Sequence, residues 1–130
     1  MKKLIVSAFE PFGGSGRNSS LETLRALPEI LYGYEIVKVT LPVVYGECGR
    51  LLCGKIAEYD PSEIAAVICL GQAAGRGSIT PEYAALNVRH GASADNAGVK
   101  YELTPIGDGT ECGHYSGCPR WRDRGIRYAP

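Results

Sequence analysis

The sequence lacks any excess of charge, because its 14 Lys and Arg residues are balanced by 14 Asp and Glu residues. A net charge of zero argues against a nucleic-acid binder or a membrane-surface binder and favours small or neutral partners. No apolar run approaches the roughly 18 residues that a membrane-spanning helix needs. Glu10, Pro11 and two glycines interrupt the opening apolar run before a signal-peptide core can form, so we expect a cytoplasmic protein.

A disulfide framework is also not expected, because five cysteines are an odd number in a chain without a secretory signal. We therefore expect the cysteines to be reduced thiols. Cys112, His114 and Cys118 could offer three zinc ligands, but no second ligand pair stands at a recognised spacing. A Cys/His metal-binding module is kept only as an alternative.

Internal repeats, heptads and low-complexity tracts are absent too. The 130 residues suffice for one domain that removes roughly two thirds of its unfolded surface from water. Periodicity ends near Asp108, where glycine, proline and arginine become frequent. We expect a domain over residues 1–119 and an irregular, Arg-rich tail over 120–130.

Strand and helix patterns alternate along the first half of the chain. Apolar or alternating runs predict strands at 4–9, 34–39 and 64–70, and apolar stripes predict helices near 19–27 and 47–59. The nearly continuous apolar run at 64–70 predicts a strand that is covered on both faces. This order favours an α/β fold with a mainly parallel sheet covered by helices.

Local signals refine these elements. Ser19 and Glu22 form a candidate capping box, and Pro28 should end the helix that carries Leu21, Leu24 and Leu27. In the second helix, one face is expected to consist of Cys48, Leu52, Ile56 and Tyr59.

A hairpin-like excursion is expected further along. A strand at 83–88, a turn at 95–98 and a strand at 99–103 would form it.

Glycine-rich loops follow the strands at 4–9 and 64–70. Neither loop has the Gly-Lys-Ser/Thr ending of a phosphate-binding loop or the full dinucleotide fingerprint, so nucleotide binding is disfavoured. Ligands collect at the carboxyl ends of strands in open α/β sheets, so we expect a binding cleft between the two loops.

Three segments carry a resemblance to a known family. They are the loop Phe9-Glu10-Pro11-Phe12-Gly13-Gly14 with Asn18 after it, the run GQAAGRGSITPE at 71–82, and the run ADNAG at 94–98. Together they resemble the pyroglutamyl-peptidase I family of cysteine peptidases, which remove pyroglutamate from the amino terminus of peptides. The resemblance implies a phosphorylase/hydrolase-like α/β fold and no metal or organic cofactor.

The resemblance also implies roles for individual residues. Glu82 would be the acid of a Cys–His–Glu triad, aimed by the restricted backbone of Thr80 and Pro81. Phe9 and Phe12, which burial statistics alone would treat as core aromatics, would form the walls of the pyroglutamate pocket. Gln72 would lie beside the substrate. In supporting roles, Asn18 would hold the loop or cap the first helix, and Arg76 would pair with a neighbouring carboxylate. Cys69, in its apolar run, is expected to be buried and inert.

The chain departs from the family pattern at two places. Ala92 stands where many members have arginine, and the resemblance fades after Pro119. In the family the nucleophilic cysteine and the histidine lie further downstream, so we expect a truncated, inactive chain. A non-catalytic remnant that binds pyroglutamyl ends, or serves only as an interaction fragment, is the alternative. Peptides with an amino-terminal pyroglutamate are the expected partners, and we also expect the isolated chain to associate with itself as a homo-oligomer.

Overall fold

A parallel sheet organises the described part of the chain, which comprises residues 1–82 and 88–106 of a computed structural model. At its centre, β1 (Lys3–Phe9) pairs in parallel with β3 (Tyr34–Leu41) on one side and with β4 (Ile64–Cys69) on the other. The two-residue β2 (Ile30–Leu31), which the sequence did not predict, adds to β3 in antiparallel fashion. The expected α/β fold with a mainly parallel sheet is confirmed.

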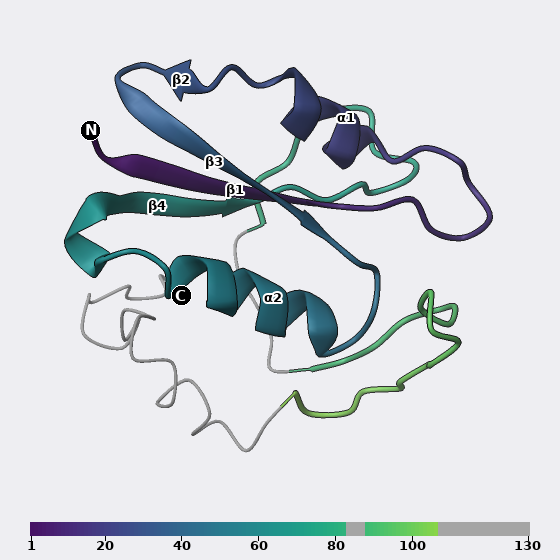
Figure 1. Cartoon of the computed structure of the whole chain (residues 1–130). Helices are drawn as coiled ribbons and strands as arrows, with labels where there is room; N and C mark the ends of the chain where they lie inside the picture. The colour runs from purple at the N-terminus through teal and green to yellow at the C-terminus, as the bar shows by residue number, and fades with distance from the viewer. Residues whose placement is uncertain (83–87, 107–130) are drawn as a thin grey trace, which may run out of the picture.

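One helix covers each face of this sheet (Figure 1). The first, α1 (Ser19–Ala26), connects β1 to β3, and α2 (Glu47–Ile56) with the short 3-10 turn η1 (Pro61–Glu63) connects β3 to β4. The second connection runs back across β1, so two crossovers of the usual hand place their helices on opposite faces. Within the described residues, no helix is long and apolar enough to cross a membrane.

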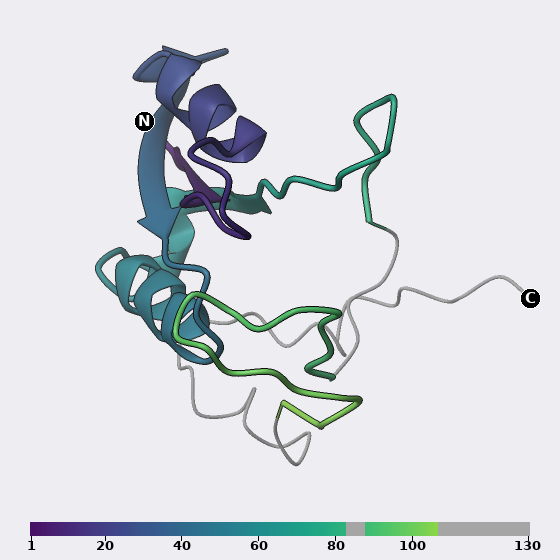
Figure 2. The same ribbon diagram turned by 90° about the vertical axis from the view of Figure 1, so that its right-hand side faces the viewer.

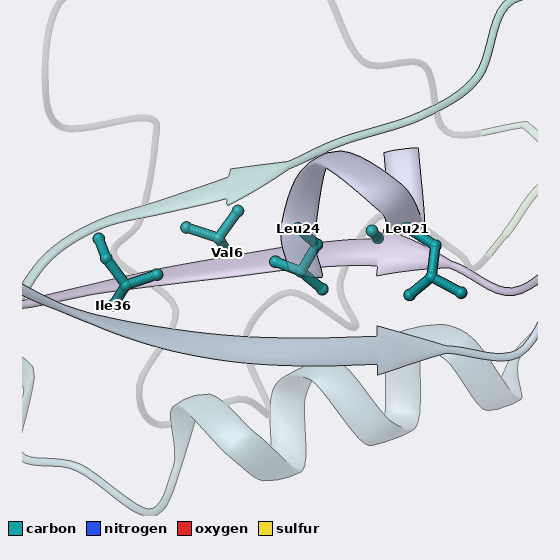
Figure 3. Packing of buried hydrophobic residues seen from close by; sticks show 5 residues of the cluster. Val6, Leu21, Leu24 and Ile36 are labelled. Carbon is teal, nitrogen blue, oxygen red and sulfur yellow. The ribbon is translucent and has the colours of Figure 1, made fainter. Parts of the chain in front are cut away.

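The core therefore forms two layers, one under each helix. Figure 3 shows the α1 layer, in which Leu21 and Leu24 pack on Val6 of β1 and Ile36 of β3. The α2 layer lies on the opposite face of the same strands, around Ile5. Both expected helix faces are confirmed, since Leu27 packs against the first layer and the following residues pack against the second: Cys48, Leu52, Ile56 and Tyr59.

The helix ends differ from expectation. The capping box of Ser19 was wrong, because the cap of α1 is Asn18, whose Oδ1 accepts hydrogen bonds from the backbone N–H and the hydroxyl of Ser20 at 3.0 and 2.7 Å. Glu22 instead forms an ion pair with Arg17, with 2.6 Å between Glu22 Oε1 and Arg17 Nε. The second helix ends at Ile56, so Tyr59 packs on the core from the residues that follow it.

The expectation that β4 is covered on both faces was also wrong. Val67 and Ile68 are 39% and 43% exposed, and Cys69, expected to be a buried thiol, is exposed as well. In the described part of the chain, β4 pairs only with β1 and forms an edge of the sheet. Both helices pack over β1 and β3 instead, so among the described residues only Ile64 of β4 packs on the α2 layer and the rest of the strand is exposed.

The excursion after β4 is only partly hairpin-like. Most of the strand expected at 83–88 lies outside the described residues, and the turn at 95–98 is present. The strand expected at 99–103 is absent, and one antiparallel bridge, from Arg89 to Thr104, joins the two sides. Leu103 has a left-handed φ of 43°, which interrupts the extended geometry that a strand needs.

Candidate functional site

The candidate site lies at the carboxyl edge of the sheet. The strand order changes direction around β1, and ligands of open α/β sheets gather where the loops of such neighbouring strands meet. The loops after β1 and β4 carry the residues that the sequence singled out. In Figure 2 the segment after β4, residues 70–82, extends away from the sheet and from both helices.

The loop after β1, residues 9–15, is called the wall loop here because it carries both candidate wall aromatics. It closes in a tight turn in which the Ser15 N–H donates to the carbonyl of Phe12 at 3.2 Å. Gly13 and Gly14 have φ of 63° and 76°, a conformation that glycine adopts without steric cost. Phe12 is 38% exposed, whereas Phe9 is partly buried and packs on the α2 layer of the core.

Two amide side chains make hydrogen bonds around the start of α1, next to this loop. Asn18, only 1% exposed, caps α1 and donates from Nδ2 to the Glu10 carbonyl at 3.1 Å, so it both caps the helix and holds the loop. Gln72 accepts a hydrogen bond from the backbone N–H of Ser19 at 2.7 Å. That bond joins the segment after β4 to the start of α1, and it brings Gln72 to the wall-loop side of the sheet.

Glu82 lies in an ion pair. Arg76 Nη1 contacts Glu82 Oε1 at 2.8 Å and the hydroxyl of Thr80 at 2.7 Å. Both charged side chains are well exposed, at 48% for Arg76 and 74% for Glu82. Among the described residues no histidine contacts Glu82, and His90 instead accepts a hydrogen bond from the Leu103 N–H at 3.4 Å. The structure thus brings Arg76 and Glu82 together, but no described contact joins Glu82 to the wall loop.

The turn at 95–98 contributes residues that the sequence reasoning left without a role. Asp95 Oδ1 accepts from the N–H groups of Ala97 and Val99, each at 2.9 Å, and Oδ2 accepts from the Tyr45 N–H at 2.9 Å. These hydrogen bonds hold the pKa of Asp95 below its usual value. The largest effect comes from the Tyr45 N–H, followed by that of Val99 and then that of Ala97. Asp95 therefore fastens its turn to the loop after β3.

Asn96 extends this connection to the wall loop. Its Nδ2 donates to Glu10 Oε1 at 3.2 Å and to the carbonyl of Pro11 at 3.0 Å. Its backbone N–H donates to the Val43 carbonyl at 2.8 Å. Neither Glu10 nor Asn96 was assigned a role from sequence, although an Asp-Asn-x-Gly turn is a recognisable signal for side chains that bond to nearby backbone.

No group of three metal-ligating side chains occurs within residues 1–82 and 88–106. The alternative zinc ligands Cys112, His114 and Cys118 lie outside the described residues. Two shallow hollows, of about 510 and 380 Å³, lie beside β3, one near β2 and one against α2, and none of the candidate site residues lines them.

The fold and the loops define an α/β protein whose candidate site residues lie on the loops that follow the carboxyl ends of a parallel sheet. The chain belongs to the pyroglutamyl peptidase family, whose model matches residues 2–122. This match confirms the resemblance that the sequence motifs carried.

Individual relatives agree with the family. The chain is 43% identical to a pyrrolidone-carboxylate peptidase of Streptococcus suis over 74% of this chain and 43% of the relative. It is 38% identical to one from Thermococcus kodakarensis over 90% of this chain and 55% of the relative. Its structure is similar to the pyroglutamyl peptidase I of Bacillus amyloliquefaciens, with a TM-score of 0.76 and 32% identity over 83% of this chain and 50% of that one. The chain thus spans about half the length of the relatives it matches.

Proposed function

We propose that this chain supplies the substrate pocket and the triad acid of a pyroglutamyl-peptidase site, in a cysteine omega-peptidase that removes amino-terminal pyroglutamate from peptides. The observation that carries this proposal is the Gln72–Ser19 hydrogen bond of 2.7 Å. It ties the segment that leads to Glu82 to the helix start beside the wall loop, where the family resemblance puts the substrate.

The pocket chemistry suits a pyroglutamyl ring, which is flat and apolar on its faces and carries a lactam N–H and carbonyl at its edge. Phe12, 38% exposed, offers an aromatic face, and Phe9, which is partly buried against the α2 layer, would offer a second. The Oε1 atom of Gln72 is occupied by Ser19, so its amide nitrogen is left to donate to the lactam carbonyl.

Glu82 would act through a histidine, by holding its tautomer and stabilising the imidazolium that forms when a cysteine gives up its proton. Arg76 binds only Oε1 of this carboxylate. The other oxygen, Oε2, would accept from the histidine, while Arg76 keeps the carboxyl group oriented.

Acyl transfer needs a nucleophile and a base within hydrogen-bond reach of each other, and the acid only orients the base. In the family that this chain resembles, the nucleophile and the base correspond to positions beyond Pro130. We accordingly propose that the 130-residue chain alone does not hydrolyse a pyroglutamyl amide.

A fluorogenic pyroglutamyl substrate tests both statements. The chain alone should give no turnover. A fusion to the part of the Bacillus amyloliquefaciens enzyme that this chain does not cover should give at least weak turnover. In that fusion, Glu82→Gln should lower kcat about 100-fold or more and leave KM nearly unchanged, because the triad acid acts mainly in the transition state.

Glu102→Gln is the matched control, because Glu102 is a similarly exposed carboxylate in a pair with Lys100. Equal activity of the two variants would show that Glu82 is not the triad acid. Turnover by the chain alone, abolished by Glu82→Ala, would refute its inactivity. Binding of pyroglutamyl peptides without turnover in the fusion would favour the non-catalytic alternative.

A further inference from the structure

One amide side chain holds the middle of the wall loop. Asn96 Nδ2 donates to the carboxylate of Glu10 at 3.2 Å and to the carbonyl of Pro11 at 3.0 Å. These two acceptors belong to the residues between Phe9 and Phe12 in the chain. Any shift of the loop centre relative to the turn at 95–98 would break one or both bonds.

The chemistry of the two partners fixes the orientation of the amide. A carboxylate and a peptide carbonyl only accept hydrogen bonds, so the NH₂ group of Asn96 must face both of them. An aspartate at this position could not donate and would set a second carboxylate against Glu10. The site is therefore selective for an amide over an acid of the same shape.

The turn that presents Asn96 is itself firmly held. Asp95 binds three backbone N–H groups, that of Ala97 in the turn, that of Val99 directly after it and that of Tyr45, each at 2.9 Å. Gly98 adopts a φ of 81° and donates to the Asp95 carbonyl at 3.0 Å. The Asn96 backbone adds a bond of 2.8 Å to Val43. The donor is thus anchored to the loop after β3 rather than to a freely moving segment.

Glu10 is held from the opposite side as well. The buried Asn18 donates to its carbonyl at 3.1 Å, while Asn96 and the Val43 N–H, at 3.4 Å, bind its side chain. The backbone of Glu10 is thereby tied to α1, and its carboxylate is tied to the turn at 95–98. A residue held at both ends in this way determines how far apart its flanking segments lie.

We propose that Glu10 and Asn96 form a clamp that sets the spacing between Phe9 and Phe12 and thereby selects a flat five-membered lactam ring. The proposal rests on the proposed function for the identity of the ring. The two residues are positioning residues, since they act through the aromatic walls and not on the reacting atoms.

The chain offers a direct probe of this clamp, because Phe9 and Phe12 are its only two phenylalanines. Biosynthetic replacement with para-fluorophenylalanine gives one fluorine NMR signal from each wall, and Phe12→Tyr assigns them by deleting one signal. The measurement uses the full 130-residue chain and needs no catalysis.

Asn96→Asp should shift or broaden both fluorine signals, because two facing carboxylates repel and the loop centre is released. Glu10→Gln, which keeps the shape and leaves an acceptor for Asn96, should change them little. The double variant Glu10→Gln with Asn96→Asp exchanges donor and acceptor and should return the signals towards the parent values. Ser93→Asp, an exposed acid in the same segment, is the charge control, and circular dichroism shows whether each variant keeps its fold.

Pyroglutamate is then titrated into each labelled chain. It should move both signals of the parent and bind about tenfold more weakly to Asn96→Asp. The double variant should recover part of that loss, because it restores the bond to position 10 but not the bond to the Pro11 carbonyl. Signals that are indifferent to Asn96→Asp, or a double variant worse than the single one, would overturn the clamp. A third result is that the variants shift the fluorine signals but pyroglutamate does not shift those of the parent. The clamp would then stand, but the proposed pocket and the selectivity that depends on it would be overturned.

Discussion

At the scale of single residues, Ser7 is unusual because its hydroxyl is fully buried in the central strand. It is 0% exposed, and no hydrogen-bond partner for Oγ occurs among residues 1–82 and 88–106. A buried hydroxyl without a partner costs about 1–3 kcal/mol of desolvation. Ser20, also buried at 4%, is the opposite case, since its hydroxyl bonds to Asn18 at 2.7 Å.

We predict that Ser7→Ala leaves the free energy of unfolding unchanged or raises it by up to about 1 kcal/mol, because it removes an unsatisfied group at little cost in packing. Ser20→Ala should lower it by about 1 kcal/mol, because it leaves Asn18 short of a donor. Urea denaturation of both variants measures the difference. If Ser7→Ala destabilised the chain as much as Ser20→Ala, the Ser7 hydroxyl would have a partner in solution.

Asp95 leads to a prediction about acid stability. Backbone N–H groups of Tyr45, Val99 and Ala97 hold its pKa below the unfolded value of about 3.9. Its contribution to stability is therefore fully present above that value and is lost as the pH falls through the lower pKa of the folded state. Asp95→Asn should lower the thermal midpoint at neutral pH and have progressively less effect as the pH approaches 3.

Thermal denaturation across the range from neutral to acid pH measures this difference between parent and variant. Glu102→Gln serves as the control, because the Glu102 carboxylate is an exposed acid that pairs with Lys100 at 3.5 Å and accepts no backbone N–H from the described residues. A constant difference between the parent and Asp95→Asn at every pH would show that the loss is steric and not linked to protonation.

At the scale of elements, the hairpin between β2 and β3 depends on an unusual turn. Leu31 pairs with Tyr34, which leaves a two-residue loop in which Tyr32 and Gly33 have φ of 48° and 81°. Positive φ at both positions is typical of a type I′ turn, which favours asparagine followed by glycine. Tyr32 is 92% exposed, so its side chain gains no burial that would offset the backbone cost.

Tyr32→Asn should therefore raise the free energy of unfolding by about 0.5–1 kcal/mol, and Gly33→Ala should lower it by about 1 kcal/mol. Chemical denaturation of the two variants provides the measurement. A loss of stability in Tyr32→Asn would mean that the tyrosine ring makes a contact in solution that compensates for its backbone conformation.

The elements also show what sequence could and could not predict. Both helix faces and the three long strands followed from apolar periodicity, because residues such as Leu24 and Ile5 are buried for reasons that local spacing reveals. The exposure of Ile68 could not be predicted in this way, because the cover of a strand depends on which strands become its neighbours. The role of Asn96 was also hidden, because its partners Glu10 and Pro11 are distant in sequence.

At the scale of the whole molecule, β4 is the strand that stands out, because within residues 1–82 and 88–106 it presents an unpaired edge and apolar side chains on both faces. Val67 and Ile68 project to opposite sides of the sheet and are 39% and 43% exposed. Such an edge recruits other chains, because it offers backbone hydrogen bonds and apolar area together. We therefore predict that the 130-residue chain associates with itself and is only marginally stable.

Light scattering of the parent and of Ile68→Lys measures this tendency, and the lysine variant should be less associated, because a charge on an edge strand opposes pairing. Ile79→Lys is the matched control, since Ile79 is fully exposed in the segment after β4 and away from the edge. A clean monomer with a cooperative transition at about 45–65 °C would contradict the prediction.

The bond between Asn96 and Glu10 spans 86 positions of the chain. During synthesis, Glu10, Asn18 and the first helix leave the ribosome long before Asn96 is made. The sheet and α1 can therefore form early, while the loop that carries Phe12 gains its bonds to Asn96 only after residue 96 has been made. The proposed clamp can therefore close only after the sheet and α1 are in place, and a nascent chain stopped before residue 96 would have this scaffold without the bond that holds the wall loop.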